Sequence, residues 1–515
     1  MLRTKSGRAG TLLAALGLAT LSATSGGSGG AGATALAHGV VMHPTVSDYS
    51  QVSTSTTPPT EDQCFSAGRR CFTPQSTQAA YNVNPLYAER IDGHGIDGHG
   101  ITIAIVDSFG SDTMAHDLHV YDHAFGLAPM CGEEGVTCAP GMPTFSQFHY
   151  GGAPATKAPP ATSHGTGQED RSAWALEVAL DVETSHAMAP GANILLVTTP
   201  TAETLGVQGF PDMMNAEQYV IDHHMANIIS QSFASAEGAF GSAQSLQNLR
   251  HAYISAAQNG VTVLGSSGDT GTANGKKTPV GKGGSAIPEP TVVWPASDPL
   301  VTGVGGTSLC TDPNNTVARV VDSTDPPVQC QGAFAGQAEV VWQRLSAGVA
   351  TGGGFSQVFS RPPYQDVLPA GSTPIPAGTR GVPDIGLQAN SRTGALVYIS
   401  LPPDGNSGLN CSGTPCSTGW YDIGGTSLSC PQWAGLVALA DQINGGGLGL
   451  INPALYKLGA DPAAYANDFY DVTVGNNQAD PTIAGYDATP GWDPTTGLGT
   501  PNAANLLPDL VTASH

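Results

Sequence analysis

Short apolar runs separated by helix-like segments fill the middle of this 515-residue chain. The runs are continuous and β-rich, as expected of strands buried on both faces. They cover residues 101–106, 193–197, 227–229, 261–264 and 300–304. Helix-like segments lie between them at 171–187, 213–224 and 242–259. This alternation predicts an α/β fold with a doubly wound, mostly parallel sheet and helices on both faces. In such a sheet, ligands bind at the carboxyl ends of the strands.

Residues 1–37 have the pattern of a secretory signal peptide. Basic residues near the start precede an apolar stretch from Thr11 to Leu21, and small residues end at Ala37. No later run approaches the roughly 20 apolar residues of a membrane span. We therefore expect a secreted, extracellular protein. Residues 38–71, rich in Ser, Thr and Pro, are expected to form an extended N-terminal segment, and residues 72–508 the main domain.

The chain is strongly acidic. Its 18 basic and 41 acidic side chains give a formal net charge of -23. Nucleic acids and anionic membranes are disfavoured as partners, because both bind through basic patches. We expect a monomer suited to an acidic surrounding, where partial protonation relieves the repulsion between carboxylates.

Eight of the nine cysteines lie in close sequence pairs, which predicts four local disulfides and an oxidising compartment. The expected pairs are Cys64 with Cys71, Cys131 with Cys138, Cys310 with Cys330, and Cys411 with Cys416. Cys430 has no such neighbour and stands in an apolar stretch, so we expect a buried free thiol there.

The tetrapeptide Gly-Gly-Thr-Ser occurs twice, and only one copy suits a nucleophile. The copy ending at Ser427 is followed by Pro431 and an apolar stretch with helical periodicity, so Ser427 is expected to start a helix. The N–H groups and the positive dipole end of such a helix stabilise an oxyanion. The copy ending at Ser308 runs into polar loop residues. Ser427 is therefore the candidate nucleophile of a serine hydrolase.

Two sets of side chains could accept the proton of the serine hydroxyl. Glu177 and Asp181 lie four residues apart on an apolar helix, so they share one face and point into the fold or a cleft. The alternative is His164, which with Asp107 and Ser427 would give the residue order of a subtilisin-type triad. His164 stands in a polar, glycine-rich stretch that no apolar helix carries inward. The carboxylate pair is therefore favoured.

The loop SSGDTG, residues 266–271, follows the apolar run at 261–264 and carries Asp269. Subtilisin-type enzymes place an asparagine amide in the corresponding loop to donate to the oxyanion, whereas a carboxyl group can donate only when protonated. Asp269 is therefore a candidate oxyanion-hole acid, which favours activity at acidic pH. The alternative is that Asp269 is an ordinary turn residue.

Four separate motifs together resemble the sedolisin family of serine-carboxyl peptidases over roughly residues 72 to 505. They are EVALD with HAMAPGA, SSGDTG, GGTSLSCP, and DVTVGNN with ATPGWDPTTGLGTPN. The resemblance implies a subtilisin-like fold and hydrolysis of peptide bonds in proteins or peptides. The roles that it implies are nucleophile for Ser427, general base for Glu177, the carboxylate that holds and polarises Glu177 for Asp181, and oxyanion-hole acid for Asp269.

The same resemblance implies one structural calcium ion near the end of the chain. Its ligands would be the side chains of Asp471 and Asp493 and the backbone carbonyls of Val472, Thr489 and Gly491. Such hard oxygen ligands in glycine-rich turns suit calcium. Thr489 stands where the family usually has glycine, and a carbonyl ligand survives this change if the backbone angles suit threonine.

Two further departures from the family pattern bear on function. Asp107 stands where some members carry a glutamate that extends the carboxylate network. Family precursors usually have a long inhibitory prosegment, whereas roughly 35 residues separate the expected signal peptide from the main domain. This short spacing counts against activation by removal of a folded prodomain. The competing functions are a subtilisin-type peptidase that uses His164 and a secreted binding protein that keeps the fold without turnover.

Overall fold

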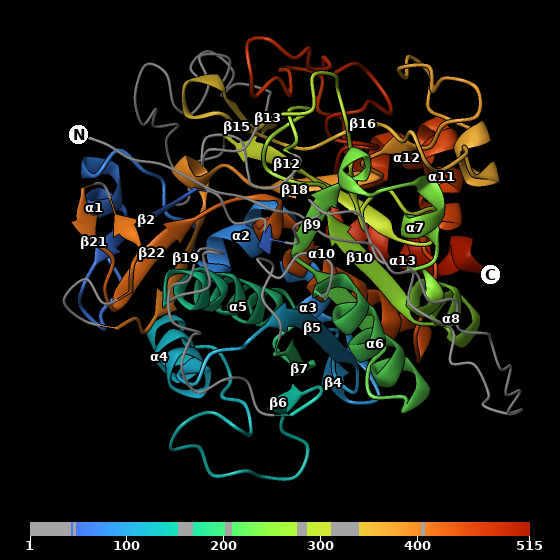
Figure 1. The fold of residues 1–515 in the computed structure, drawn as a ribbon. Helices are drawn as coiled ribbons and strands as arrows, with labels where there is room; N and C mark the ends of the chain where they lie inside the picture. Colours follow the sequence, from blue (N-terminus) through green and yellow to red (C-terminus); the bar gives the residue numbers. More distant parts are fainter. Residues whose placement is uncertain are drawn as a thin grey trace, which may run out of the picture. The chain divides into compact units, whose positions relative to one another are not determined.

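An eight-stranded sheet forms the centre of the fold (Figure 1). The strand order is β13-β12-β10-β8-β5-β7-β6, and β18 also pairs with β12. Every pairing is parallel except that of β12 with β13. The strands are β5 (Thr102–Ser108), β6 (Phe145–His149), β7 (Asn193–Thr199), β8 (Ile228–Gln231), β10 (Thr262–Ser266), β12 (Thr302–Leu309), β13 (Glu339–Val341) and β18 (Ile385–Gln388). All five predicted apolar runs belong to this sheet, so the predicted α/β fold is confirmed.

The computed structural model describes residues 43–44, 48–152, 168–200, 209–275, 286–310, 339–402, 407–411 and 413–515. The expected signal peptide at 1–37 and the alternative base His164 lie outside the described residues.

Helices cover both faces of the sheet (Figure 1). On one face, α5 (Gln168–Met188) and α10 (Thr426–Asn444) share an apolar core with Ile103 and Ile105 of β5. On the other face, α6 (Gly209–Asp222) and α8 (His251–Asn259) share a core with Ala104 and Val106. Because successive strand residues point to opposite faces, the middle of β5, from Ile103 to Val106, must be apolar throughout.

Smaller elements surround this centre. Further helices are α1 (Glu61–Ser66), α2 (Pro74–Ala80), α3 (Asn84–Ala88), α4 (Met114–Phe125), α7 (Ala243–Gln247), α11 (Asn452–Ala460), α12 (Pro462–Asp468) and α13 (Ala503–Ser514). One three-stranded sheet is β1 (His43–Pro44), β9 (Phe233–Ala236) and β11 (Val293–Trp294), and another is β19 (Ala395–Ile399), β22 (Gly419–Ile423) and β2 (Tyr49–Ser53). Short pairs include β14 (Gln343–Arg344) with β15 (Val349–Ala350), and β16 (Gly354–Phe355) with β17 (Gly381–Val382).

Two expectations about secondary structure were wrong in part. The segment 242–259 forms two helices, α7 and α8, instead of one. The break falls at residues 248–250, where Arg250 binds both carboxylate oxygens of Asp298. The N-terminal segment contains the extended strand β2, but it is not extended throughout, because it also contains the helix α1. Helix α1 is stabilised by a capping box between Thr60 and Gln63. Because these are polar residues, the helix has no periodic apolar pattern by which the sequence could have predicted it.

Three of the predicted disulfides are present: Cys64–Cys71, Cys131–Cys138 and Cys411–Cys416. Cys330, the expected partner of Cys310, lies outside the described residues. Cys430 is a buried free thiol, as predicted. Within the described part of the chain, no helix is both long and apolar enough to span a membrane.

Candidate active site

Three carboxylic acids come together between β5 and α5. Glu177 and Asp181 are one helical turn apart on α5, and both are fully buried. Asp107, next to the last residue of β5, is also fully buried. Asp181 interacts electrostatically with both other acids. The structure therefore brings the predicted base, its predicted partner and Asp107 into one carboxyl cluster at the carboxyl end of a central strand.

Burial makes ionisation of this carboxyl cluster costly. Removal from water raises the pKa of Asp107 to about 8. Burial, and then the negative charges of Asp107 and Glu177, raise the pKa of Asp181 well above its ordinary value. Neither carboxylate oxygen of Asp107 has a hydrogen-bond partner among the described residues. Since neighbouring buried carboxyl groups resist ionising together, the cluster retains protons to a higher pH than separate exposed acids.

Ser232 is a member of this site that sequence reasoning did not assign. It follows β8 directly, is fully buried, and donates a hydrogen bond from its hydroxyl to Oδ1 of Asp181 at 3.0 Å. This bond favours the ionised form of Asp181 and opposes the effect of burial on its pKa. Ser232 follows the carboxyl end of a predicted central strand, where ligands bind in such sheets. This position is the feature of the sequence that could have identified Ser232 as a site residue.

Ser427 is the second residue of α10, as predicted, and is fully buried. The two glycines before it allow this tight entry into the helix. Gly425 has a φ of 110°, and a Cβ atom at Gly424 would come within 2.2 Å of the carbonyl oxygen of Ala389. Helix α10 packs against α5. Cys430, one turn after Ser427, interacts electrostatically with Asp181 and Glu177, so the first turns of α10 face the carboxyl cluster.

Asp269 is bonded to the residue that precedes Ser427. Its Oδ1 accepts hydrogen bonds from the backbone N–H of Thr426 at 2.8 Å and from the hydroxyl of Thr426 at 2.9 Å. The Thr426 hydroxyl in turn accepts a hydrogen bond from the backbone N–H of Gly268 at 3.0 Å. An ordinary turn aspartate bonds its own loop, whereas Asp269 bonds a residue 157 positions later. The loop and the start of α10 are thereby held together.

The Gly-Gly-Thr-Ser copy that ends at Ser308 lies in a strand, not at a helix start. Ser308 is a buried residue of β12, and its hydroxyl accepts a hydrogen bond from Nδ2 of Asn390 at 2.9 Å. Only Ser427 therefore stands at a helix start, as the sequence predicts.

Two peptidases align with more than half of this chain. It is 30% identical to kumamolisin of Bacillus sp. (strain MN-32) over 455 residues, which cover 88% of this chain and 66% of kumamolisin. It is 32% identical to sedolisin of Pseudomonas sp. (strain 101) over 305 residues, which cover 58% of this chain and 43% of that protein. The chain belongs to the sedolisin family.

A solved sedolisin structure supports the subtilisin-like fold. Pseudomonas sedolisin complexed with two molecules of pseudo-iodotyrostatin matches with a TM-score of 0.61 and 24% identity, covering 87% of this chain and 100% of that one. Human tripeptidyl-peptidase 1 is 28% identical over 367 residues, which cover 67% of this chain and 53% of that protein. The chain thus spans about two thirds or less of the length of these curated relatives. No family model matches the sequence.

The residues that the sedolisin resemblance assigns to calcium lie around one turn. The carboxylate of Asp471 accepts from the backbone N–H of Gly491 at 3.0 Å, and that of Asp493 accepts from the N–H of Thr489 at 3.1 Å. The carbonyls of Val472, Thr489 and Gly491 accept no backbone hydrogen bond from other described residues. Two acidic side chains and three uncommitted carbonyls fit a hard cation. The described residues contain no cluster of three or more acidic, His or Cys side chains suited to a metal.

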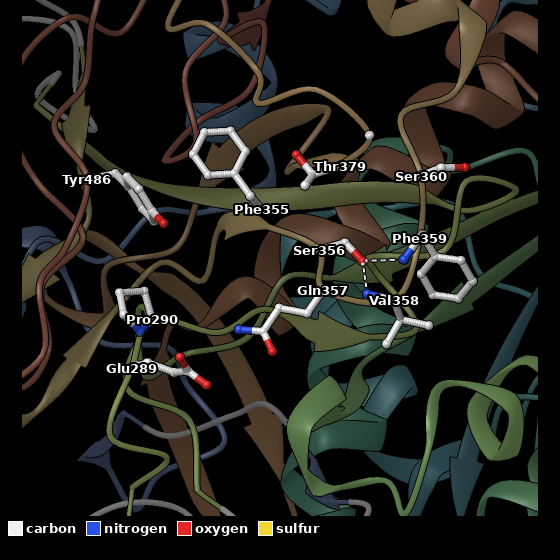
Figure 2. A pocket seen from close by; sticks show the side chains of 11 residues that line it. Glu289, Pro290, Phe355, Ser356, Gln357, Val358, Phe359, Ser360, Thr379 and Tyr486 are labelled. Carbon is white, nitrogen blue, oxygen red and sulfur yellow. Dashed lines mark hydrogen bonds between the residues drawn. The ribbon is translucent and has the colours of Figure 1, made fainter.

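A cavity of about 470 Å³ lies beside the end of β16, at Phe355. Its walls include Phe355, Phe359, Tyr486, Pro290, Gln357 and Glu289. Figure 2 shows Gln357 extending toward Pro290 and Glu289, with the rings of Phe355 and Tyr486 at another wall. Gly352, three residues before Phe355, donates its backbone N–H to the carbonyl of Gly268 at 2.7 Å. The cavity wall is thus connected to the loop that carries Asp269.

Proposed function

We propose that this sedolisin-family chain is a secreted serine-carboxyl peptidase that hydrolyses peptide bonds in proteins or peptides at acidic pH. The observation that carries the proposal is the bonding of Asp269 to Thr426, which holds an acid side chain next to Ser427. The buried Glu177 and Asp181, on the helix that packs against α10, supply the proton acceptor and its partner. Export is supported by the predicted signal peptide and by three disulfides.

The proposed reaction divides the work among these four side chains. The hydroxyl oxygen of Ser427 attacks the substrate carbonyl while Glu177 accepts the hydroxyl proton. Asp181 orients Glu177. Protonated Asp269 donates to the oxyanion, together with N–H groups at the start of α10. Glu177 then gives its proton to the leaving amine. A water molecule, activated by Glu177, releases the acyl group from Ser427. The cavity beside Phe355 and Tyr486 would accept an apolar or aromatic substrate side chain.

The variants Asp269→Asn and Asp269→Ala test the oxyanion role. Asparagine keeps an oxygen for the two Thr426 bonds and an N–H donor at every pH, so we expect it to retain part of the activity. Alanine has neither group. It should lose about 2.7 to 4 kcal/mol of transition-state stabilisation, which lowers kcat by about 100- to 1,000-fold. Rates of the folded variants across several pH values should show the asparagine enzyme active to a higher pH than the wild type. Full activity of Asp269→Ala at the acid optimum would show that Asp269 does not stabilise the oxyanion and has only a structural role in its loop.

We expect the folded protein to be most stable in acid. In the native state, burial raises the pKa of Asp107 and that of Asp441 to about 8, while both acids ionise near pH 4 when unfolded. Between these values the native state keeps protons that the unfolded state has lost. The free energy of unfolding therefore falls as pH rises from about 4 to about 8, and this contribution is fully present below about pH 4.

Urea unfolding at several pH values, with the variant Asp441→Asn, checks this prediction. Oδ1 of asparagine can still accept the N–H of Leu448 that Asp441 binds at 2.9 Å. The pH slope of stability should be shallower by up to about 1.4 kcal/mol per pH unit. A wild-type stability that rises through this range would contradict the assignment.

We also propose that Asp471, Asp493 and the carbonyls of Val472, Thr489 and Gly491 hold one calcium ion. The ion would neutralise two acids in the turn and fix the C-terminal region; it takes no part in the reaction. A chelator should lower the melting temperature, because an ion bound only by the native state stabilises it, by about 2.7 kcal/mol at 100 times the Kd. Asp493→Asn should melt lower and respond no further to the chelator. Equal melting of metal-loaded and metal-free wild type, verified by elemental analysis, would exclude the site.

A further inference from the structure

A second group of ionisable side chains lies near the C-terminal end of α5. His186, in the last turn of this helix, is fully buried, and its Nε2 lies 3.2 Å from Oδ2 of Asp122 on α4. Asp122 is buried as well. Helices α4 and α5 pack side by side (Figure 1). Because a buried ion pair is stable only while both partners keep their charges, this contact between the helices depends on pH.

Glu133 connects this ion pair to a loop. It lies in the loop that the Cys131–Cys138 disulfide closes, and its side chain is fully buried. Oε1 of Glu133 accepts a hydrogen bond from the backbone N–H of Met130, and the carboxyl group interacts with Asp122. His186, Asp122 and Glu133, here called the His186 cluster, thus join α5, α4 and the disulfide loop.

The next glutamate of the loop has different surroundings. The side chain of Glu134 is 64% exposed, whereas that of Glu133 is 0% exposed. Oε2 of Glu134 lies 2.5 Å from Nδ1 of His116, and Oε2 of Glu133 lies 3.2 Å from Nδ1 of His119. Both histidines belong to α4. The loop therefore holds two adjacent acids that both face α4 and that differ in burial.

Two further buried acids lie beside the His186 cluster. Asp117 of α4 accepts a hydrogen bond from the hydroxyl of Ser400 at 2.6 Å. Glu183 of α5 interacts electrostatically with Asp117 and Asp122. Helix α2, which also packs on α5, has no titratable side chain. The other titratable groups that face the cluster or these two acids are His116, His119, His123 and Tyr121 of α4, Glu134 of the loop and Tyr398 of β19.

A rise in pH removes protons that stabilise the cluster. Burial raises the pKa of Glu133 to about 7; the Met130 N–H opposes this shift and Asp122 adds to it. Burial by itself lowers the pKa of His186, but Asp122 and then Glu133 outweigh burial, so this pKa lies above its ordinary value. The closed cluster therefore keeps the Glu133 proton between about pH 4.3 and 7, and the His186 proton above about pH 6.5, where an open segment has lost them. Both effects stabilise the closed cluster in acid and are lost as pH rises.

We propose that the His186 cluster is a pH-sensitive latch. In acid it holds α4 and the disulfide loop closed on α5, the helix that carries Glu177 and Asp181, and towards neutral pH it opens. Once Glu133 has lost its proton and His186 its charge, the carboxylates of Glu133 and Asp122 lie buried without a cation, and opening exposes them to water. The opening does not depend on the proposed peptidase function, whereas its effect on hydrolysis rests on that function.

Hydrogen exchange of the full-length protein between pH 5 and 6.5, measured by mass spectrometry and corrected for the pH dependence of chemical exchange, tests the latch. In the wild type, exchange in α4 and in residues 127–144 should rise by up to about 10-fold per pH unit, because opening releases one proton. The central strand β8 should stay protected. Glu133→Gln keeps an oxygen for Met130 and an N–H for Asp122 at every pH, so its exchange should not rise. Glu134→Gln is the matched control and should follow the wild type.

His186→Gln tests the same latch in the opposite direction. It removes the cation and leaves Asp122 buried without its partner, so exchange of α4 and of residues 127–144 should already be at least about 10-fold faster than in the wild type at pH 5. This variant decides the question if Glu133→Gln does not fold, as judged by circular dichroism. Wild-type exchange that does not change with pH would overturn the latch. So would an equal rise in β8, or a Glu133→Gln variant that follows the wild type.

The lifetime of activity at pH 7.5 tests the effect on the active site. Samples are returned to the acid optimum for assay, so that reversible ionisation of Asp269 does not contribute. Because local opening leads to irreversible loss of activity, Glu133→Gln should extend the half-life by at least about 10-fold, and Glu134→Gln should not. Equal half-lives would overturn the link between the latch and the active site and leave the peptidase function standing. Absence of hydrolysis in every folded variant would remove the peptidase function, and hydrogen exchange would still decide whether the latch opens.

Discussion

Ser427→Ala is expected to lower peptide hydrolysis by at least about 1,000-fold, because the Ser427 oxygen forms the acyl intermediate of the proposed reaction. The substitution removes one oxygen from the second residue of α10 and leaves the packing of α10 against α5 in place. Rates on a denatured protein at the acid optimum, with the melting temperature of each protein measured alongside, provide the comparison.

Ser308→Ala is the matched control for this substitution. Both serines are fully buried and both end the same tetrapeptide, so the two changes remove the same chemical group from the same local sequence. Ser308 lies in β12, where its hydroxyl accepts a hydrogen bond from Asn390. Loss of this hydroxyl should lower stability and change activity little. Equal losses of activity in two folded variants would remove the reason for choosing Ser427.

The central sheet was predictable because its strands are buried on both faces. Strand β5, for example, sends Ile103 and Val106 into opposite cores, so the sequence between these two residues is a continuous apolar run. The same reasoning placed Glu177 and Asp181 inward, since the helix that carries them is apolar nearly all round. In each case a local pattern reflects the surroundings of the residue in the fold.

Contacts between distant segments had no such local pattern. The bond from Ser232 to Asp181 and the bonds from Thr426 to Asp269 join segments whose relative positions depend on the completed sheet. Strand β1 contains only two residues, and its pairing depends on an edge about 190 residues later in the chain. The Ser/Thr/Pro-rich composition around it therefore indicated an extended segment and gave no hint of its partner.

The structure also changes how Asp107 is interpreted. In the subtilisin-type alternative, Asp107 would have to be ionised to hold a protonated histidine. Its burial and its raised pKa of about 8 instead favour the protonated form in acid. Its electrostatic partner is Asp181, an acid of the same cluster. Asp107 thus fits a network of carboxyl groups that share protons better than it fits a histidine triad.

Glu177→Gln is expected to lower activity by roughly 100-fold or more, because an amide cannot accept the Ser427 proton. The change is nearly isosteric, so the buried face of α5 stays filled. Glu183→Gln is a matched control on the same helix: Glu183 is also fully buried, but it accepts the backbone N–H of Tyr398 at 2.9 Å, which the oxygen of glutamine can still do. That variant should keep most of its activity.

His164→Ala completes this experiment, because it removes the base of the competing triad. With Glu177 as the base, His164→Ala should cost little activity at any pH, and the remaining activity should keep its acid optimum. An inactive His164→Ala beside an active Glu177→Gln, with both proteins folded, would instead establish the subtilisin-type triad of Asp107, His164 and Ser427. The pH profile provides a second criterion: a histidine base must be neutral, so its activity would rise through about pH 6.5. With Glu177 as the base, protonated Asp269 must donate to the oxyanion, so we expect the activity to decline as pH rises instead.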